Sequence, residues 1–198
     1  MQNALTIRLA TQADHHYADQ ISNMYRESSK QRGTGIAIRQ PEYIKEKINE
    51  EKAMIAFVGS ELAGFCYIET FSKGTYVSNS GLIVSLKFRS MGLGKKIKKE
   101  IFTLARDKYP EAKVFGITTS NAVMKINSDL GYRPVSFSEL TDDKEFWKGC
   151  NSCPNYDILQ RNDQKLCLCT GMLAPSKNEI MKHDITHLIM NEKDETND

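Results

Sequence analysis

The sequence has no hydrophobic run long enough to cross a membrane, and it lacks the basic start and apolar stretch that form a signal peptide. It also lacks an excess of charge of one sign, since 27 Lys and Arg balance 25 Asp and Glu to within +2. Such a balance does not favour nucleic acid or an anionic membrane as a partner. We therefore expect a cytoplasmic protein that binds neither, and either a monomer or a homodimer is compatible with this composition.

Internal repeats are also absent, and 198 residues suit one domain with an appendage. We expect the main domain over residues 1–175, with a cysteine-rich insertion at 147–169. Residues 176–198 are predicted to form a C-terminal helix followed by a disordered tail.

Apolar patterning predicts eleven elements in the order β-α-α-β-β-β-α-β-α-β-β. Alternating or β-branched runs predict the strands, and apolar residues at helical spacing predict the helices. This order, with hairpins and one β-α-β crossover, indicates an α/β or α+β fold with a mixed sheet. The predicted strands cover 5–9, 53–58, 62–71, 76–86, 113–118, 135–137 and 165–173, and the predicted helices cover 14–29, 41–51, 95–109 and 121–129.

The most informative segment is Arg89-Ser90-Met91-Gly92-Leu93-Gly94, which stands between a predicted strand and a predicted helix. Its glycines allow a tight turn and close approach of a ligand to the backbone. The free amides and the dipole at the start of the following helix suit a phosphate or pyrophosphate.

A turn whose glycines serve only local geometry is the alternative, because the spacing matches neither the dinucleotide fingerprint nor the P-loop. The basic residues around the turn favour an anion-binding site, because cations near a helix N-terminus are unfavourable with the helix dipole unless an anion is also present. These residues are Arg89, Lys95, Lys96, Lys98 and Lys99.

The element order and the Arg-x-x-Gly-x-Gly turn resemble the GCN5-related N-acetyltransferase superfamily. A second match is Asn121, which begins a predicted helix closing in Leu130-Gly131-Tyr132. The resemblance implies that the backbone amides of the turn hold the pyrophosphate of acetyl-CoA. It also implies that the preceding strand splays from its neighbour and pairs with the pantetheine arm. The implied cofactor-binding residues are Ile83, Val84, Arg89, Ser90, Met91, Gly92, Leu93, Gly94, Lys95 and Asn121.

The sequence departs from this family at both proton-transfer positions. Asn127 stands where many members carry the tyrosine that protonates the leaving thiolate; an amide can donate a hydrogen bond to sulfur but cannot act as an acid. No carboxylate lies between Tyr76 and Val84, where many members carry the base. We expect Glu69 to serve instead, with a solvated glutamate at the strand end as the alternative. Positioning of the amine, with proton transfer through water, also fits the family.

Further residues resemble the acetyltransferase domain of bacterial N-acetylglutamate synthases, which acylate the α-amine of glutamate. They are Thr118-Thr119, Gly131-Tyr132-Arg133-Pro134-Val135, Leu140 and Asn155-Tyr156. A substrate carboxylate needs fixed donors, which arginine forks supply well. Arg32 and Arg39, on the glycine-containing segment 30–40, are the candidates; ordinary loop charges are the alternative.

Four cysteines form a further group of candidate functional residues, in the patterns Cys150-x-x-Cys153 and Cys167-x-Cys169. Two close pairs of thiols can make a tetrahedral zinc site, and the predicted strand over 165–173 would point the second pair to one face. Such a site would be structural, because four cysteines leave no open position. Reduced, buried thiols and a redox pair are the alternatives. Cys66, alone on a predicted strand, is interpreted as core.

The sequence therefore predicts an N-acetyltransferase that uses acetyl-CoA, or another acyl-CoA such as succinyl-CoA, to acylate a primary amine of a small molecule. An amino acid such as glutamate is one candidate acceptor. A non-catalytic acyl-CoA-binding module and a zinc-organised interaction domain are the alternatives.

Overall fold

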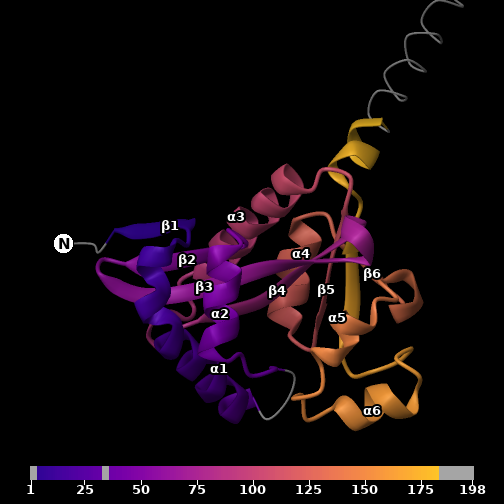
Figure 1. The fold of residues 1–198 in the computed structure, drawn as a ribbon, viewed down its shortest axis with the longest axis horizontal. Helices are drawn as coiled ribbons and strands as arrows, with labels where there is room; N and C mark the ends of the chain where they lie inside the picture. Colours follow the sequence, from indigo (N-terminus) through magenta and orange to yellow (C-terminus); the bar gives the residue numbers. More distant parts are fainter. Residues whose placement is uncertain (1–3, 33–35, 183–198) are drawn as a thin grey trace, which may run out of the picture.

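The computed structural model describes residues 4–32 and 36–182, and its central feature is a seven-stranded mixed sheet with helices on both faces (Figure 1). The strand order is β1-β2-β3-β4-β5-β7-β6, and only β4 and β5 run parallel. The mixed α/β sheet predicted from the element order is confirmed.

The strands are β1 (Leu5–Leu9), β2 (Ala53–Val58), β3 (Glu61–Phe71), β4 (Tyr76–Val84), β5 (Lys113–Thr118), β6 (Arg133–Val135) and β7 (Thr170–Ala174). The α-helices are α1 (Ala18–Arg32), α2 (Pro41–Asn49), α3 (Leu93–Lys108), α4 (Asn121–Asp129), α5 (Lys144–Lys148) and α6 (Tyr156–Arg161). Short 3-10 turns occupy Gln12–Tyr17, Ser72–Gly74, Leu86–Phe88 and Phe137–Glu139.

The sheet divides where β4 leaves β5. The two strands pair only from Tyr76 opposite Lys113 to Ser78 opposite Phe115. Beyond Ser78, β4 continues along β3, whereas β5 continues along β7 as far as Thr118. The described structure therefore leaves one edge of β4 without a strand partner from Asn79 onward.

A bulge in β4 accompanies this divergence. Tyr67 of β3 pairs with Ser80, but Phe65 pairs with Ile83, so β4 carries one extra residue between these pairs. Gly81 lies in the bulge with φ of +63°, a conformation that costs little only for glycine. The Tyr25 hydroxyl of α1 donates a hydrogen bond to the Gly81 carbonyl and ties the bulge to the helix.

The two faces of the sheet carry different helices. Apolar residues of α3, among them Ile97 and Ile101, pack on one face. On the other face, α1 and α2 cover one half with Ile21 and Ile44. The second half of that face carries a hydrophobic cluster that joins the sheet to the insertion after β6, made of Phe71, Phe115, Phe137, Leu140, Trp147, Leu159 and Leu173. Figure 1 shows α1–α2 and α5–α6 as separate groups.

The structure corrects several predicted boundaries. The last strand begins at Thr170, not at 165, because β5 ends at Thr118 and offers no partner to earlier residues. Asp14 lies in a 3-10 turn and α1 starts at Ala18. The insertion begins earlier than predicted, at 144 instead of 147, because it contains α5 as well as α6, neither of which the periodicity predicted. A helix is present over 177–182, and the predicted tail after it lies outside the described residues.

Candidate functional site

The backbone of the turn between β4 and α3 curves sharply and is open to solvent on one side. Ser90 and Gly92 both adopt positive φ, of +67° and +72°. A Cβ added to Gly92 would meet no atom within 4 Å, and Met91 is 61% exposed. The turn therefore faces open space at the N-terminus of α3, where the amides of the first helical turn point outward.

The basic residues of this segment are held in different ways. Arg89 donates to Ser28 Oγ at 3.0 Å and to Gln31 Oε1 at 3.1 Å, which fastens the turn to α1. Lys95 forms an ion pair with Asp129 of α4 at 2.7 Å. The first helical turn contains no acidic residue, so the helix dipole retains its attraction for an anion.

Lys98 does not belong to this group, and its inclusion among the charges around the anion was wrong. Its side chain points inward from α3, and Nζ donates to both the backbone oxygen and Oδ1 of Asn79 at 2.8 Å. The residue is 3% exposed, and burial lowers the pKa of its amine. The sequence carried a signal for this placement, because Lys98 shares helical spacing with the buried Ile101, Phe102 and Ala105.

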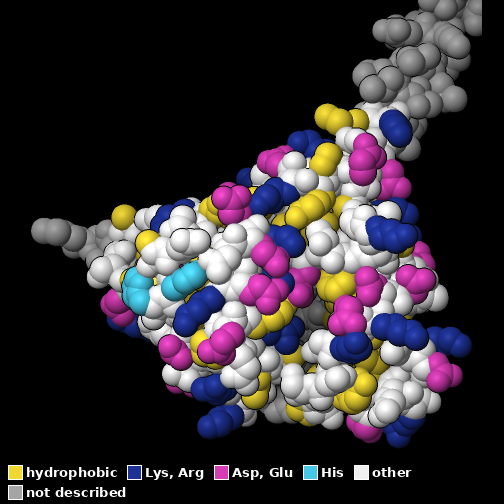
Figure 2. Space-filling view, in the orientation of Figure 1, with side chains coloured by type: hydrophobic (Ala, Val, Ile, Leu, Met, Phe, Trp, Pro, Cys, Tyr) yellow, Lys and Arg dark blue, Asp and Glu magenta, His cyan; other side chains and the backbone are white. Residues whose placement is uncertain are grey.

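A cleft of about 650 Å³ opens where β4 and β5 diverge. One wall is the segment 36–40 with Tyr43 of α2, and the opposite wall is the segment 145–153 of the insertion. The floor includes Glu69 of β3, Asn79 to Leu82 of β4, and Thr118 of β5. Figure 2 shows a hollow in the surface between these two walls, with acidic and basic side chains intermixed around the hollow.

Glu69 lies in this cleft, beside the point of divergence. It pairs across the sheet with Ser78, the last β4 residue that pairs with β5. Its side chain is 22% exposed and lies 3.6 Å from Lys47 Nζ of α2. Burial and the nearby oxygens of Tyr67 and Glu69 raise the pKa of Tyr43, so this phenol stays protonated beside the Glu69 carboxylate.

Arg39 lies on the same wall of the cleft. Its Nε donates to the Tyr67 hydroxyl at 2.5 Å, and its guanidinium stacks over the rings of Tyr43 and Tyr67. Within the described residues, its two Nη nitrogens have no hydrogen-bond partner. Arg32 is the last residue of α1, and its side chain lies outside the described part of the structure.

Two asparagines of α4 lie apart from the cleft lining. Asn121 begins the helix at an exposed position after the Ser120 cap. Asn127 is 2% exposed, and its Nδ2 donates to Met172 Sδ at 3.7 Å. Its Oδ1 has no partner among the described residues. A role for Asn127 at the thioester sulfur stays a prediction.

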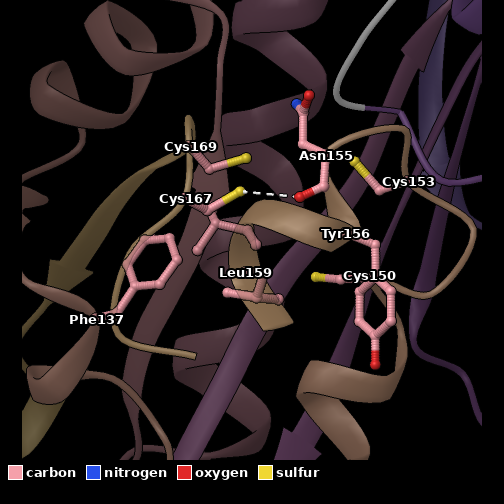
Figure 3. A pocket seen from close by; sticks show the side chains of 9 residues that line it. Phe137, Cys150, Cys153, Asn155, Tyr156, Leu159, Cys167 and Cys169 are labelled. Carbon is pink, nitrogen blue, oxygen red and sulfur yellow. Dashed lines mark hydrogen bonds between the residues drawn. The ribbon is translucent and has the colours of Figure 1, made fainter. Parts of the chain in front are cut away.

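The four cysteines of the insertion line one small cavity of about 20 Å³ (Figure 3). The prediction that Cys167 and Cys169 lie on a strand was wrong, because both precede β7. Burial and the neighbouring cysteines raise the pKa of Cys150 to about 11 and that of Cys169 to about 12. In the described part of the chain, no three metal-binding side chains are already arranged to hold an ion.

Cys66 is buried in the core, as interpreted from the sequence, and burial raises the pKa of its thiol to about 11. Sequence reasoning missed Tyr43 and Lys98 as parts of the cleft, and Tyr67 as the buried partner of Arg39. Tyr67 had a weak signal, because it stands two residues before Glu69 on the same face of a strand.

In the portion described, no helix has the length and apolar character needed to cross a membrane.

No family model and no curated protein matches the sequence. Solved structures do match the fold. The N-acetylglutamate synthase of Neisseria gonorrhoeae, solved with coenzyme A and N-acetyl-glutamate, is 18% identical with a TM-score of 0.63. That match covers 89% of this chain and 36% of the synthase, so the chain spans about a third of that protein's length.

Two shorter proteins match over nearly their whole length. The ribosomal-protein-S18-alanine N-acetyltransferase of Escherichia coli is 11% identical with a TM-score of 0.56, over 87% of this chain and 94% of that one. A Salmonella typhimurium protein solved with its cofactor acetyl-CoA is 13% identical with a TM-score of 0.59, over the same shares. At these identities the likeness shows the fold, which this chain shares with solved N-acetyltransferases.

Proposed function

We propose that this chain, which has the fold of the GCN5-related N-acetyltransferases, transfers an acetyl group from acetyl-CoA to the primary amine of a small molecule. The observation that carries the proposal is the cleft between the diverging β4 and β5, with the open turn 89–94 at the N-terminus of α3. The fold shared with the acetyl-CoA-bound Salmonella protein supports it.

The cofactor is proposed to lie along β4. Backbone amides of the turn, from Arg89 to Lys95, would hold the pyrophosphate, since helix N-termini bind anions. The edge of β4 around Ile83 and Val84 would pair with the amides of the pantetheine arm. The thioester would then reach the divergence near Ser78, on the floor of the cleft.

The amine is proposed to attack the thioester carbonyl directly, in a ternary complex. A C–N bond forms, the C–S bond breaks, and the nitrogen loses one proton while coenzyme A gains one. Glu69 is the candidate base, directly or through a water, because it is a carboxylate in the cleft beside the divergence. Tyr43 and Lys47 would fix its orientation. Holding the two reactants in line supplies much of the rate enhancement in such a reaction.

An acceptor that carries a carboxylate is supported by Arg39. The described contacts of this guanidinium leave both Nη nitrogens for a ligand, and a planar fork binds a carboxylate with two hydrogen bonds. Tyr67 and Tyr43 hold the guanidinium rigidly, which lowers the entropy lost on binding. Glutamate is the leading candidate, and Arg32 is a second possible donor.

The cofactor site is tested with a matched pair of substitutions, Gly92→Asp and Gly74→Asp. Both glycines have positive φ, of +72° and +86°, and neither has an atom within 4 Å of an added Cβ. The backbone strain is therefore similar, but only Gly92 adds negative charge where the pyrophosphate is proposed to bind. Gly92→Asp is expected to weaken acetyl-CoA binding by roughly tenfold or more, equivalent to ~1.4 kcal/mol. Calorimetric titration that gives equal affinities for the two folded variants would overturn the assignment.

A further inference from the structure

The cysteine cluster brings together residues that are distant in the sequence. Cys150 and Cys153 follow α5, and Cys167 and Cys169 follow α6, yet all four line one cavity. Figure 3 shows the Cys167 and Cys169 sulfur atoms near each other on one side of the Asn155 backbone, and those of Cys150 and Cys153 on the other side. The other cysteine, Cys66, lies in the core between β3 and α3 and takes no part. The fold has therefore gathered every thiol of the insertion into one place.

Local geometry favours pairwise chelation. The Cys153 amide donates to the Cys150 carbonyl at 2.8 Å, which closes a tight turn between the two thiol-bearing residues. The Cys167 thiol contacts the Asn155 carbonyl at 3.8 Å, and Cys167 and Cys169 belong to no helix or strand. The cavity of about 20 Å³ has room for one water-sized particle. A zinc site requires the four sulfurs to lie ~2.3 Å from one ion, so binding would draw the two irregular segments that carry them together.

The insertion has little regular secondary structure of its own. Its two helices span only five and six residues, too short to be stable alone. Apolar contacts of Trp147 and Leu159 hold one side of the insertion to the sheet. Segments with so little regular structure commonly gain their stability from a bound metal or a disulfide.

We propose that Cys150, Cys153, Cys167 and Cys169 bind one zinc ion as a closed, structural site. On binding, each thiol loses its proton to solvent and forms one S–Zn bond, so up to four protons are released per ion and no electron is transferred. Four thiolates fill the tetrahedral coordination of zinc and leave no position for substrate. The site is separate from the proposed acyl transfer and does not depend on it.

The ion would also shape the neighbouring cleft. Cys150, Cys153 and Cys169 line the large cleft as well as the small cavity, so the metal would fix the cleft wall that faces Arg39. If the wall is fixed in this way, and given the proposed function on which this step rests, removal of zinc is expected to raise KM for the amine more than KM for acetyl-CoA. Metal content is measured without any substrate, so a failure of the zinc site and a failure of the proposed function are distinguishable.

The test is the zinc content of the full chain, measured by plasma mass spectrometry after desalting. About one zinc per chain is expected in the wild type. Cys167→Ala is expected to lose it, whereas the matched control Cys66→Ala keeps it. Absence of zinc after loading with excess ion, or full zinc content in Cys167→Ala, would overturn the proposal.

A second measurement needs no variant and therefore does not depend on how well a cysteine variant folds. The wild-type protein is alkylated before and after chelation, and each cysteine is followed by peptide mass spectrometry. Protection of the four insertion cysteines that is lost on chelation supports the site. Equal alkylation with and without the chelator, or a mass two hydrogens lower that identifies a disulfide, would contradict it.

Discussion

Gly81 in the β4 bulge offers the sharpest stability prediction, through the substitution Gly81→Ala. An ideal Cβ at this position would lie 2.1 Å from Tyr67 Cε1 and 2.7 Å from the Tyr25 hydroxyl oxygen. Both tyrosines are buried, at 0% and 2% exposure, so neither ring can swing into solvent. The added methyl must therefore displace packed side chains or the bulge itself.

Two contributions set the size of the effect. Holding an L-residue at a φ of +63° costs about 1–2 kcal/mol, and overpacking a buried site costs about 1–3 kcal/mol. Gly81→Ala should therefore destabilise the fold by about 2–5 kcal/mol. The matched control is Gly74→Ala, which has φ of +86° but no atom within 4 Å of the added Cβ. Only the backbone contribution applies there, so about 1–2 kcal/mol is expected.

Urea unfolding, followed by the fluorescence of Trp147 and by circular dichroism, measures both variants against the wild type. The difference between them isolates the steric contribution, expected at about 1–3 kcal/mol. Equal free energies of unfolding for Gly81→Ala and Gly74→Ala would refute the reasoning, because the collision with Tyr67 would then carry no cost.

Three further predictions concern charged residues. Arg8 donates to both carboxylate oxygens of Asp14 at 2.7 Å and holds the pKa of that carboxyl below its usual range. A carboxyl whose pKa is lowered on folding stabilises the fold above its unfolded pKa of about 3.9, so Asp14→Asn should lower the free energy of unfolding by about 1–3 kcal/mol at pH 7. In urea titrations this deficit should shrink as pH falls below about 4. Glu69→Gln should lower kcat by roughly 100-fold with acetyl-CoA affinity unchanged; wild-type turnover across pH would remove Glu69 from the mechanism. Arg39→Gln should raise KM roughly tenfold or more for amines that carry a carboxylate but not for those that lack one, and an equal change for both would exclude carboxylate recognition.

The sequence predicted best those elements whose ends are marked by local chemistry. The strands at 5–9, 53–58 and 113–118 and the helix at 121–129 match β1, β2, β5 and α4 to the residue, because alternating or apolar runs define the strands and a glycine stop ends the helix. The turn 89–94 was found for the same reason, since two glycines between an apolar strand and an amphipathic helix form a local pattern.

The start of β7 could not be read this way. The segment 165–169 has strand-like alternation, but strand formation requires a neighbouring chain to pair with, and β5 ends opposite Thr170. Cys167 and Cys169 therefore lie in irregular backbone. Their meeting with Cys150 and Cys153 depends on how the insertion folds back onto the sheet, which spacing alone does not specify.

The cleft illustrates the same limit. Glu69 was identified because it is the nearest carboxylate to the expected divergence, yet its contacts with Tyr43 and Lys47 come from α2, which is distant in sequence. Lys98 was assigned by charge to the anion, although its helical position beside Ile101 and Phe102 already indicated burial. Periodicity was the better guide there, because burial on an apolar face outweighs proximity in sequence.

Acetyl transfer itself is tested most directly by release of the coenzyme A thiol from acetyl-CoA in the presence of single amines. The panel should include glutamate and other amino acids, polyamines and short peptides, with the Gly74→Asp and Gly92→Asp proteins alongside. The account predicts release that depends on one class of amine, glutamate first among them, and that is lost in Gly92→Asp but kept in Gly74→Asp. Absence of amine-dependent release from a protein that binds acetyl-CoA would contradict an acetyltransferase and favour a non-catalytic acyl-CoA-binding module.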